Sequence, residues 1–477
     1  MIKYILLLII FCTVIIEGAK NRKQEYQQFR YPTLNGKEKR IEKMEEIRSA
    51  ERSNLISRLR ESVQVEITIG YRIPRGSVKQ AKENELLPAS KAFVEIDYPN
   101  DNIIKYVEPV KQLDMEGRWI AKVQIKGTSK LTLQVYMSGP FAYISNSYSL
   151  ATVPDDLRTD KNVIIYEIGI DIHSGVRRIQ RSIIFEGSAL PEGVSMDPRR
   201  AIDNPGSDRS LDNRYMLTYC VMSKLAKMTM EKLELTNVGK VKVLVNSRLP
   251  TNCVPYDAMI KIGDELMWQP MIMSHEYGHY VQYLAYKSHG VNYIAGGIPG
   301  HTICKSISEE QGWSEGYANA FGATIGTLSN LITSKTFHAK DWRNDGTKIF
   351  IDSEYYACTN LDLKMETDEG RIMAMIYDLV DSGNDPTEFP DFYKSVPNIY
   401  SSQTFNQNWF GNTNFGDTNK DCKFTVKEAL VDLLAGGQTN LKSYVQNALN
   451  FNSNSNCNKK DYVESIVRYN YGEKSLS

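Results

Sequence analysis

The sequence predicts a multidomain α+β protein, with an antiparallel β-sandwich followed by a mostly α-helical domain that has a small edge sheet. Between residues 63 and 195, apolar residues alternate with polar ones, which is the period of a half-buried strand. After residue 196, apolar residues follow the spacing of an amphipathic helix, as in residues 215–233, and short apolar runs indicate buried strands. A turn-rich stretch at residues 196–207 separates the two patterns, so we place the domain boundary there.

The first domain, residues 63–195, contains several alternating runs of similar length. These runs cover residues 63–73, 119–125, 131–137 and 164–172. Turn residues such as Pro99-Asn100-Asp101-Asn102 lie between them. Half-buried strands at this spacing are typical of an immunoglobulin-like sandwich, for which we expect a structural or substrate-positioning role.

The start of the chain has the features of a secretory signal peptide. Lys3 precedes an apolar run over residues 4–16, and small residues end the segment. Glu17 occupies a position that favours small residues, so a retained signal anchor is the alternative. We expect residues 1–19 to be removed and the protein to be secreted or to reside in the lumen of the secretory pathway.

Residues 20–62 are polar and highly charged, and opposite charges recur at helical spacing over residues 40–48. This pattern predicts an exposed, charged helical linker. The functional alternative is a pro-segment that keeps a secreted enzyme inactive until it is cleaved.

The composition argues against several classes of partner. The formal net charge is zero, with 24% charged and 42% hydrophobic residues, so nothing predicts binding to nucleic acid or to an anionic surface. No later stretch approaches the length of an apolar membrane span, so we expect none once the signal peptide is removed. The sequence leaves the oligomeric state open.

The cysteines predict disulfide bonds, because the mature chain has an even number of them in an oxidising compartment. Of the seven cysteines, only Cys12 lies in the predicted signal peptide. The others are Cys220, Cys253, Cys304, Cys358, Cys422 and Cys457. Six cysteines allow fifteen pairings, and the sequence selects none of them.

The residues with the clearest chemistry are His275-Glu276-Tyr277-Gly278-His279, an HExxH arrangement. On a helix, His275 and His279 are one turn apart and share a face, so both neutral imidazoles can reach one Zn²⁺. Glu276 lies about 100° around the helix, close enough to take a proton from a water on that metal.

A catalytic zinc ion needs a third protein ligand. The metzincin pattern would place Gly and His where Gln282 and Ala285 stand, which excludes that class. A better candidate is Glu315, in the small-residue run that begins at Gly312. We expect Glu315 on the first turn of a helix, with Asn319 on the same face one turn later.

These motifs resemble the gluzincin clan of zinc metallopeptidases, in which a second helix supplies a glutamate ligand. The resemblance implies that His275, His279 and Glu315 bind zinc and that Glu276 is the general base. The clan usually has an acidic residue at the position of Asn319, where it orients the first histidine. An amide can still accept that hydrogen bond, but without a charge it raises the basicity of the imidazole less.

The resemblance is dense over residues 268–382. Within it, the stretch from Glu369-Gly370 to Tyr377-Asp378-Leu379-Val380-Asp381 looks like the helix that follows the ligand glutamate in secreted gluzincins. An ordinary core helix is the alternative. In the clan, a sheet edge beside the zinc helix binds extended substrate, and residues 256–262 are the candidate here.

The activity that the resemblance implies is hydrolysis of a protein or peptide substrate. A zinc ion would polarise the scissile carbonyl, and Glu276 would act first as general base and then as general acid. Stabilisation of the oxyanion needs a further donor. The candidates are Tyr355, Tyr356, His289, His301 and Arg371.

Two alternatives to a peptidase stay open. One is a zinc-binding but catalytically inactive extracellular adhesion or scaffold module, which the Asn319 departure and the sandwich make conceivable. The other is a zinc hydrolase that acts on a non-peptide bond, because three ligands alone do not determine the scissile group.

Residues 417–428 have the spacing of an EF-hand-like calcium loop. The candidate ligands are Asp417, Asn419, Asp421, the carbonyl of Lys423, Thr425 and Glu428. Cys422 stands where the loop needs glycine for its sharp turn. The alternative to Ca²⁺ binding is an Asn/Asp-rich turn before a helix over residues 427–434.

Overall fold

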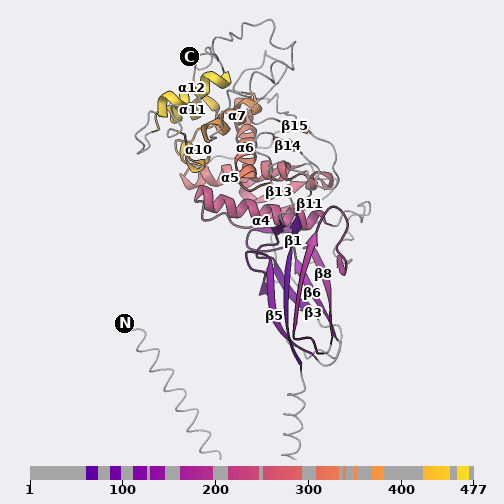
Figure 1. The fold of residues 1–477 in the computed structure, drawn as a ribbon. Helices are drawn as coiled ribbons and strands as arrows, with labels where there is room; N and C mark the ends of the chain where they lie inside the picture. Colours follow the sequence, from indigo (N-terminus) through magenta and orange to yellow (C-terminus); the bar gives the residue numbers. More distant parts are fainter. Residues whose placement is uncertain are drawn as a thin grey trace, which may run out of the picture. The chain divides into compact units, whose positions relative to one another are not determined.

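The computed structural model (Figure 1) has the predicted α+β composition, with several sheets and a set of packed helices. The structure describes residues 61–73, 86–97, 111–125, 129–145, 162–173, 175–196, 213–245, 251–292, 308–331, 337–339, 349–351, 367–380, 423–451 and 459–471. Residues Ser62–Ser477 form one compact unit. The predicted signal peptide and almost all of the predicted linker lie outside the described residues.

Two sheets form the first part of this unit. One contains β1 (Glu61–Arg72), β2 (Leu86–Pro88), β5 (Arg118–Ile125) and β9 (Arg178–Phe185). The other has the order β10 (Val194–Met196), β8 (Ile165–Ile172), β6 (Ser129–Tyr136), β3 (Phe93–Asp97) and β4 (Lys111–Gln112). All the neighbours within this second sheet are antiparallel, as the alternating pattern predicts.

Because apolar and polar residues alternate, every second side chain of these strands lies in a common core. Val65 and Ile67 of β1 are fully buried, and so are Leu131 and Leu133 of β6. They belong to one hydrophobic cluster, so the apolar faces of the two sheets bury each other's side chains. Strands β1 and β9 depart from antiparallel order, because they run parallel. These strands are far apart in the sequence, so the chain between them supplies the long connection that a parallel pair needs.

A third sheet combines strands from both sides of the predicted domain boundary. Its order is β12 (Asn252–Val254), β13 (Met259–Ile262), β11 (Val241–Val245) and β7 (Ala142–Ser145). β7 comes from the first predicted domain and pairs in parallel with β11 of the second. The boundary itself stays a prediction, because residues 197–212 lie outside the described part of the chain.

The predicted sheet edge over residues 256–262 is wrong in its position. β13 has a hydrogen-bonded neighbour on each side, so among the described strands β12 is the edge beyond it. The sequence between them does not continue as a strand, because Pro255 begins a short 3₁₀ turn and Ala258 takes a left-handed conformation. Tyr256 lies in this turn with an exposed side chain.

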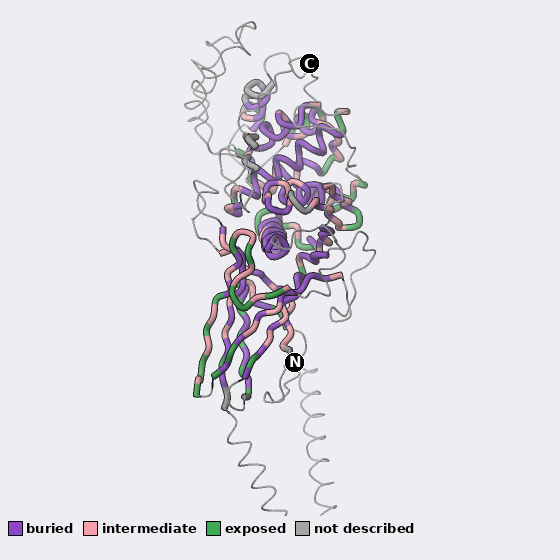
Figure 2. The backbone as a smooth tube through the Cα atoms, turned by 90° about the vertical axis from the view of Figure 1, so that its right-hand side faces the viewer, coloured by how far each residue is buried: buried purple, intermediate pink, exposed green. Residues whose placement is uncertain are grey.

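Helix α4 (Arg214–Leu233), close to the predicted 215–233, lies between the sheets and the other helices. The hydroxyl of Tyr219 donates to the Ser90 carbonyl over 2.9 Å, and the N–H of Met216 donates to the Tyr166 hydroxyl over 3.3 Å. Figure 2 shows that buried residues predominate in the helical part of the structure. Sheets and helices therefore share a continuous core.

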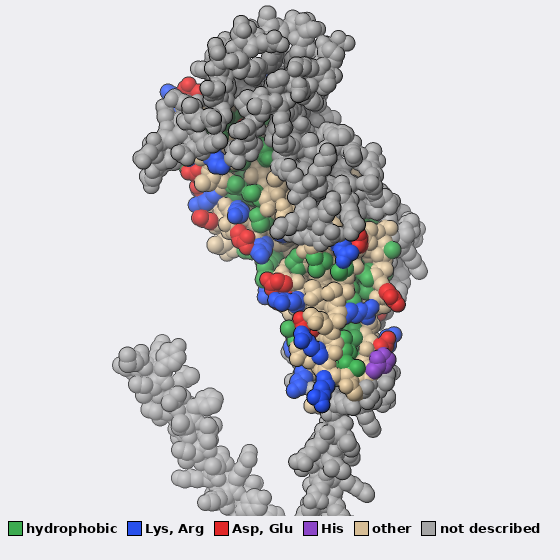
Figure 3. All heavy atoms as spheres, viewed as in Figure 1, with side chains coloured by type: hydrophobic (Ala, Val, Ile, Leu, Met, Phe, Trp, Pro, Cys, Tyr) green, Lys and Arg blue, Asp and Glu red, His purple; other side chains and the backbone are tan. Residues whose placement is uncertain are grey.

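The remaining helices surround α5 (Pro270–Ser288) and α6 (Glu309–Leu328). They are α7 (Glu369–Val380), α10 (Val426–Leu430), α11 (Leu441–Leu449) and α12 (Lys459–Tyr471). Buried tyrosines attach the C-terminal helices: Tyr317 donates to the Leu430 carbonyl, and Tyr444 donates to that of Ala429. The surface view in Figure 3 shows charged side chains of both signs on the described face.

Helix α6 begins earlier than the sequence analysis predicts. The hydroxyl of Ser308 accepts a hydrogen bond from the N–H of Gln311, and Glu309 and Glu310 occupy the first turn, where the helix dipole favours negative charge. Glu315 therefore lies at the end of the second turn, one turn later than we expected.

Two glycines let three helices approach closely. A side chain at Gly278 of α5 would lie 2.8 Å from the carbonyl oxygen of Ala318 in α6 and 2.9 Å from its Cα. On α6 itself, a side chain at Gly316 would lie 2.5 Å from Cβ of Ile372 in α7. Because the atoms that meet Gly278 belong to the backbone, the contact between α5 and α6 cannot widen locally to accommodate a methyl group.

We expect Gly278→Ala to destabilise the protein by about 1–3 kcal/mol, since one helix must move away from the other. The sign of the change in unfolding free energy distinguishes a close helix contact from an open position, because the same substitution at an open helical position stabilises by roughly 0.5–1 kcal/mol. Urea unfolding of the metal-free protein measures the change. A variant as stable as the wild type, or more stable, would contradict this account of the helix contact.

Candidate metal centre

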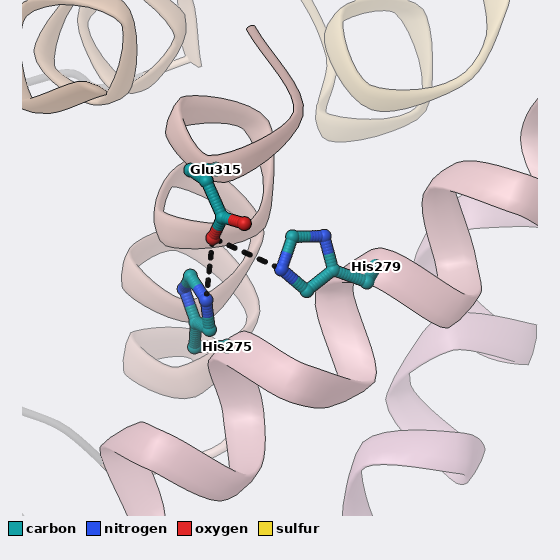
Figure 4. Close-up of side chains that lie close together, drawn as sticks. All are labelled: His275, His279 and Glu315. Atoms are coloured by element: carbon teal, nitrogen blue, oxygen red, sulfur yellow. Dashed lines mark hydrogen bonds and ion pairs between the residues drawn. The ribbon is translucent and has the colours of Figure 1, made fainter. Parts of the chain in front are cut away.

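The HExxH residues form part of α5, and Glu315 faces them from α6. The imidazoles of His275 and His279 lie one helical turn apart, with ring centroids 4.8 Å from each other. Glu315 Oε2 is 3.1 Å from His275 Nε2 and 3.1 Å from His279 Nε2. Figure 4 shows both rings turned towards the same carboxylate oxygen. The structure thus brings together the three residues that the sequence analysis proposed as ligands.

The geometry of this group fits a metal ion. The three ligand atoms all lie within 4.8 Å of one another. Zinc bonds of about 2.0–2.1 Å in a tetrahedral arrangement separate neighbouring ligand atoms by about 3.3 Å, close to the two distances observed. A small shift of the side chains would therefore admit an ion between them. Two imidazoles and one carboxylate are a donor set that zinc accepts with a further position open.

The other ring nitrogens have outer partners. His275 Nδ1 lies 2.7 Å from Asn319 Oδ1, so the amide accepts from the ring as we expected from the sequence. His279 Nδ1 lies 3.4 Å from the hydroxyl of Ser314. No sequence pattern indicates Ser314, because a residue directly before a ligand points about 100° away on an ideal helix and its spacing carries no signal.

The charges of the group favour a bound cation. Burial alone would lower the pKa of His275, but its hydrogen bond to the Glu315 carboxylate and that negative charge raise the pKa to about 9. Burial alone would raise the pKa of the Glu315 carboxyl. The charges of the two histidines and their hydrogen bonds outweigh burial and hold this pKa far below its usual range. The negative potential that retains a proton on His275 would equally attract a metal ion.

Glu276 and the edge strand also border this group. Glu276 is buried on α5, and its charge acts with that of Glu315 to raise the pKa of His275. Cys253 of β12 is close enough to be affected: burial raises the pKa of its thiol, and the charges of Glu276 and Glu315 raise it further. Strand β12 packs against α5, the helix that carries the candidate general base.

The predicted donors for the oxyanion are only partly described. His289 caps the C-terminal end of α5, about 15 Å along the helix from His279, and its Nε2 lies 3.1 Å from the Val431 carbonyl oxygen. Arg371 forms an ion pair with Asp368 at 3.2 Å. Neither residue has a described contact with the metal ligands. The other three candidates, Tyr355, Tyr356 and His301, lie outside the described residues.

The calcium loop stays a prediction, because residues 417–422 lie outside the described part of the chain. The described end of the loop forms a helix cap, in which Thr425 and Glu428 exchange hydrogen bonds. Glu428 also pairs with the buried amino group of Lys459 at 2.8 Å. A calcium ion at this end of the loop would compete with Lys459 for the carboxylate.

The remaining expectations concern the redox state and the membrane. Cys220 and Cys253 are buried free thiols, so neither takes part in the predicted disulfide bonds. The other four cysteines of the mature chain lie outside the described residues. Among the helices that the structure describes, none has the length and apolar character needed to cross a membrane.

Comparisons of this chain with models of protein families, with curated proteins and with solved structures gave no match. The functional conclusion therefore rests on the chemistry of the site.

The metal-free protein should lose stability as the pH rises from about 6 to about 9.5. The pKa of His275 is raised in the folded state from 6.5 to about 9, so its contribution is complete below pH 6.5 and disappears as the pH rises through about 9. The pKa of Glu315 is lowered, so its contribution is present above 4.5 and is lost as the pH falls. Together these groups stabilise the fold most between pH 4.5 and 6.5.

Thermal unfolding in the presence of a chelator measures this effect, which we expect to be on the order of a few kcal/mol. Glu315→Gln is the control, because it removes the charge that holds the proton on His275. A wild type and a Glu315→Gln variant with the same pH dependence would show that the pair does not contribute.

Proposed function

We propose that this chain is a secreted zinc-dependent metallopeptidase. The observation that carries the proposal is the convergence of His275 Nε2, His279 Nε2 and Glu315 Oε2. A buried carboxylate, that of Glu276, directly follows His275 on α5. Three protein ligands leave a fourth position for water or substrate, as in catalytic rather than structural zinc sites.

The donor set supports zinc over other common metal ions. Ca²⁺ and Mg²⁺ prefer sites made only of oxygen atoms, whereas two imidazole nitrogens suit zinc and related transition metals. Among those metals, zinc is the usual partner of two histidines and one glutamate in hydrolytic sites.

The chemistry divides between the ion and the protein. A zinc ion in this site would polarise the scissile carbonyl and lower the pKa of a water molecule to about 7. Glu276 would take a proton from the attacking water and pass it to the leaving amine. Its burial keeps the carboxylate away from bulk solvent, and edge strand β12 offers hydrogen-bonding groups to an extended peptide beside it.

The finer features of the fold belong to the same proposal. We infer that α5, α6 and α7 correspond to the helices of a gluzincin catalytic domain, and that the two sheets before them form an immunoglobulin-like sandwich. The order of the elements along the chain supports this, as does the attachment of the third sheet to both parts through β7. The apolar start of the chain supports secretion.

The neutral outer partner of His275 favours a second candidate function. With Asn319 in place of an acidic residue, the same site would serve a zinc-binding extracellular module without catalytic activity.

The test is cleavage of an unfolded protein by the purified mature chain, with Glu276→Gln and His279→Ala run in parallel and zinc determined in each sample. We expect Glu276→Gln to retain about one zinc ion per chain and lose roughly 10²–10⁴-fold in turnover, because the ligands stay intact while the base is lost. His279→Ala should lose both zinc and activity.

If the wild type and Glu276→Gln both bind zinc and neither cleaves, even after removal of residues 20–62, the inactive binding module replaces the peptidase. Cleavage of ester substrates, but not of peptides, in the same assay would indicate a zinc hydrolase that acts on a non-peptide bond. A wild type that binds no metal would contradict both candidate functions.

A further inference from the structure

The second ligand histidine has a buried outer contact that the proposed function does not use. His279 presents Nε2 to Glu315, while its Nδ1 lies 3.4 Å from the hydroxyl oxygen of Ser314. The same hydroxyl donates to Gln282 Oε1 over 3.3 Å. Both distances are at the long end of hydrogen bonding. All three side chains are buried, and Gln282 is completely inaccessible to solvent.

The chemistry of imidazole gives this chain of contacts a direction. A histidine that donates the Nε2 lone pair to a metal carries its proton on Nδ1, and that N–H needs an acceptor where water cannot reach it. Ser314 Oγ is the acceptor that the described residues provide. A hydroxyl that accepts on its oxygen still has a hydrogen to donate, and Gln282 Oε1 receives it.

We propose that Ser314 and Gln282 are positioning residues that hold His279 in the tautomer and ring orientation needed to bind a metal. The inference rests on the proposed metal centre and adds two residues to it. Gln282 lies on α5, three residues after His279, and Ser314 directly precedes the ligand Glu315 on α6. The contact between Ser314 and Gln282 therefore ties the outer sides of the two ligand helices together.

The contacts from His279 through Ser314 to Gln282 form a relay, which should be sensitive to substitution because the Gln282 amide is buried. Gln282 Nε2 is buried, and the described residues offer it no hydrogen-bond partner. The amide keeps that orientation only while its oxygen has a donor, which is the hydroxyl of Ser314. Removing the hydroxyl leaves two buried groups without partners, the Nδ1–H of His279 and the oxygen of Gln282.

The experiment measures Zn²⁺ affinity of the mature chain by competition with a chelator. Ser314→Ala should weaken binding by about 10–100-fold, as is typical when the outer partner of a ligand histidine is lost. Ser314→Thr keeps the hydroxyl and should restore most of the affinity. Gln282→Met should weaken binding by about tenfold, because the freed hydroxyl can then turn its hydrogen towards Nδ1 and favour the wrong tautomer.

The matched control is Ser274→Ala. Ser274 is also a buried serine directly before a ligand, but its hydroxyl donates to the carbonyl of Pro270 within its own helix over 2.8 Å. Loss of this hydroxyl should leave Zn²⁺ affinity unchanged. Thermal unfolding of each metal-free variant separates a general loss of stability from an effect at the centre, and the visible spectrum of bound Co²⁺ reports on ligand geometry.

Each outcome is decisive. If the wild type binds no Zn²⁺, the proposed metal centre itself fails. If the wild type binds but Ser314→Ala or Gln282→Met binds equally well, the centre stands and the relay is overturned. The relay is also overturned if Ser274→Ala weakens binding as much as Ser314→Ala does, or if Ser314→Thr fails to restore the affinity.

Discussion

The candidate metal centre depends on the close approach of α5 and α6, which is possible because Gly278 has no side chain. Its Cα faces the backbone of Ala318, and any added carbon would lie within 2.9 Å of that backbone. Ligands from two helices can meet one ion only if the helix axes are close enough for short side chains to span the distance. Gly278 stands between His275 and His279, so this close helix contact lies at the level of the ligands. Gly316 of α6 likewise allows a close approach, in this case between α6 and α7.

This proximity carries an electrostatic cost that the site is built to offset. Glu315 is buried among helices, where an isolated carboxylate would be strongly destabilising. Without a metal ion the two histidines compensate it, which is why the pKa of Glu315 falls and that of His275 rises to about 9. A divalent cation would replace the proton on His275 and compensate Glu315 and Glu276 together. A divalent cation therefore balances more of the buried negative charge at this point than the proton alone.

Local patterns in the sequence predicted much of this structure, while long-range contacts had to be observed. The alternation over β1, β6 and β8 placed their core faces, and the HExxH spacing placed both histidines on one side of α5. The spacing of apolar residues could not show that β7 pairs with β11 or that β12 pairs with β13, because strand pairing depends on contacts between residues far apart in the sequence. The start of α6 was misplaced because Ser308 was not recognised as a cap. The outer contact of Ser314 likewise depends on how α5 and α6 pack.

The outer contacts of the two histidines have a common chemical character. His275 donates to the amide of Asn319, and the contact from His279 leads through Ser314 to the amide of Gln282. Among the described residues, neither imidazole therefore has a carboxylate as its outer partner. Neutral acceptors orient a ring without adding negative charge to it, which leaves the imidazoles weaker donors to the metal. A zinc ion held by two such histidines and one glutamate would keep a net positive charge. That charge would hold bound water at lower pKa, so Glu276 would have an easier proton to remove. In this arrangement, the loss of an acidic outer partner weakens metal binding and strengthens the Lewis acid, which is consistent with catalysis as well as with binding.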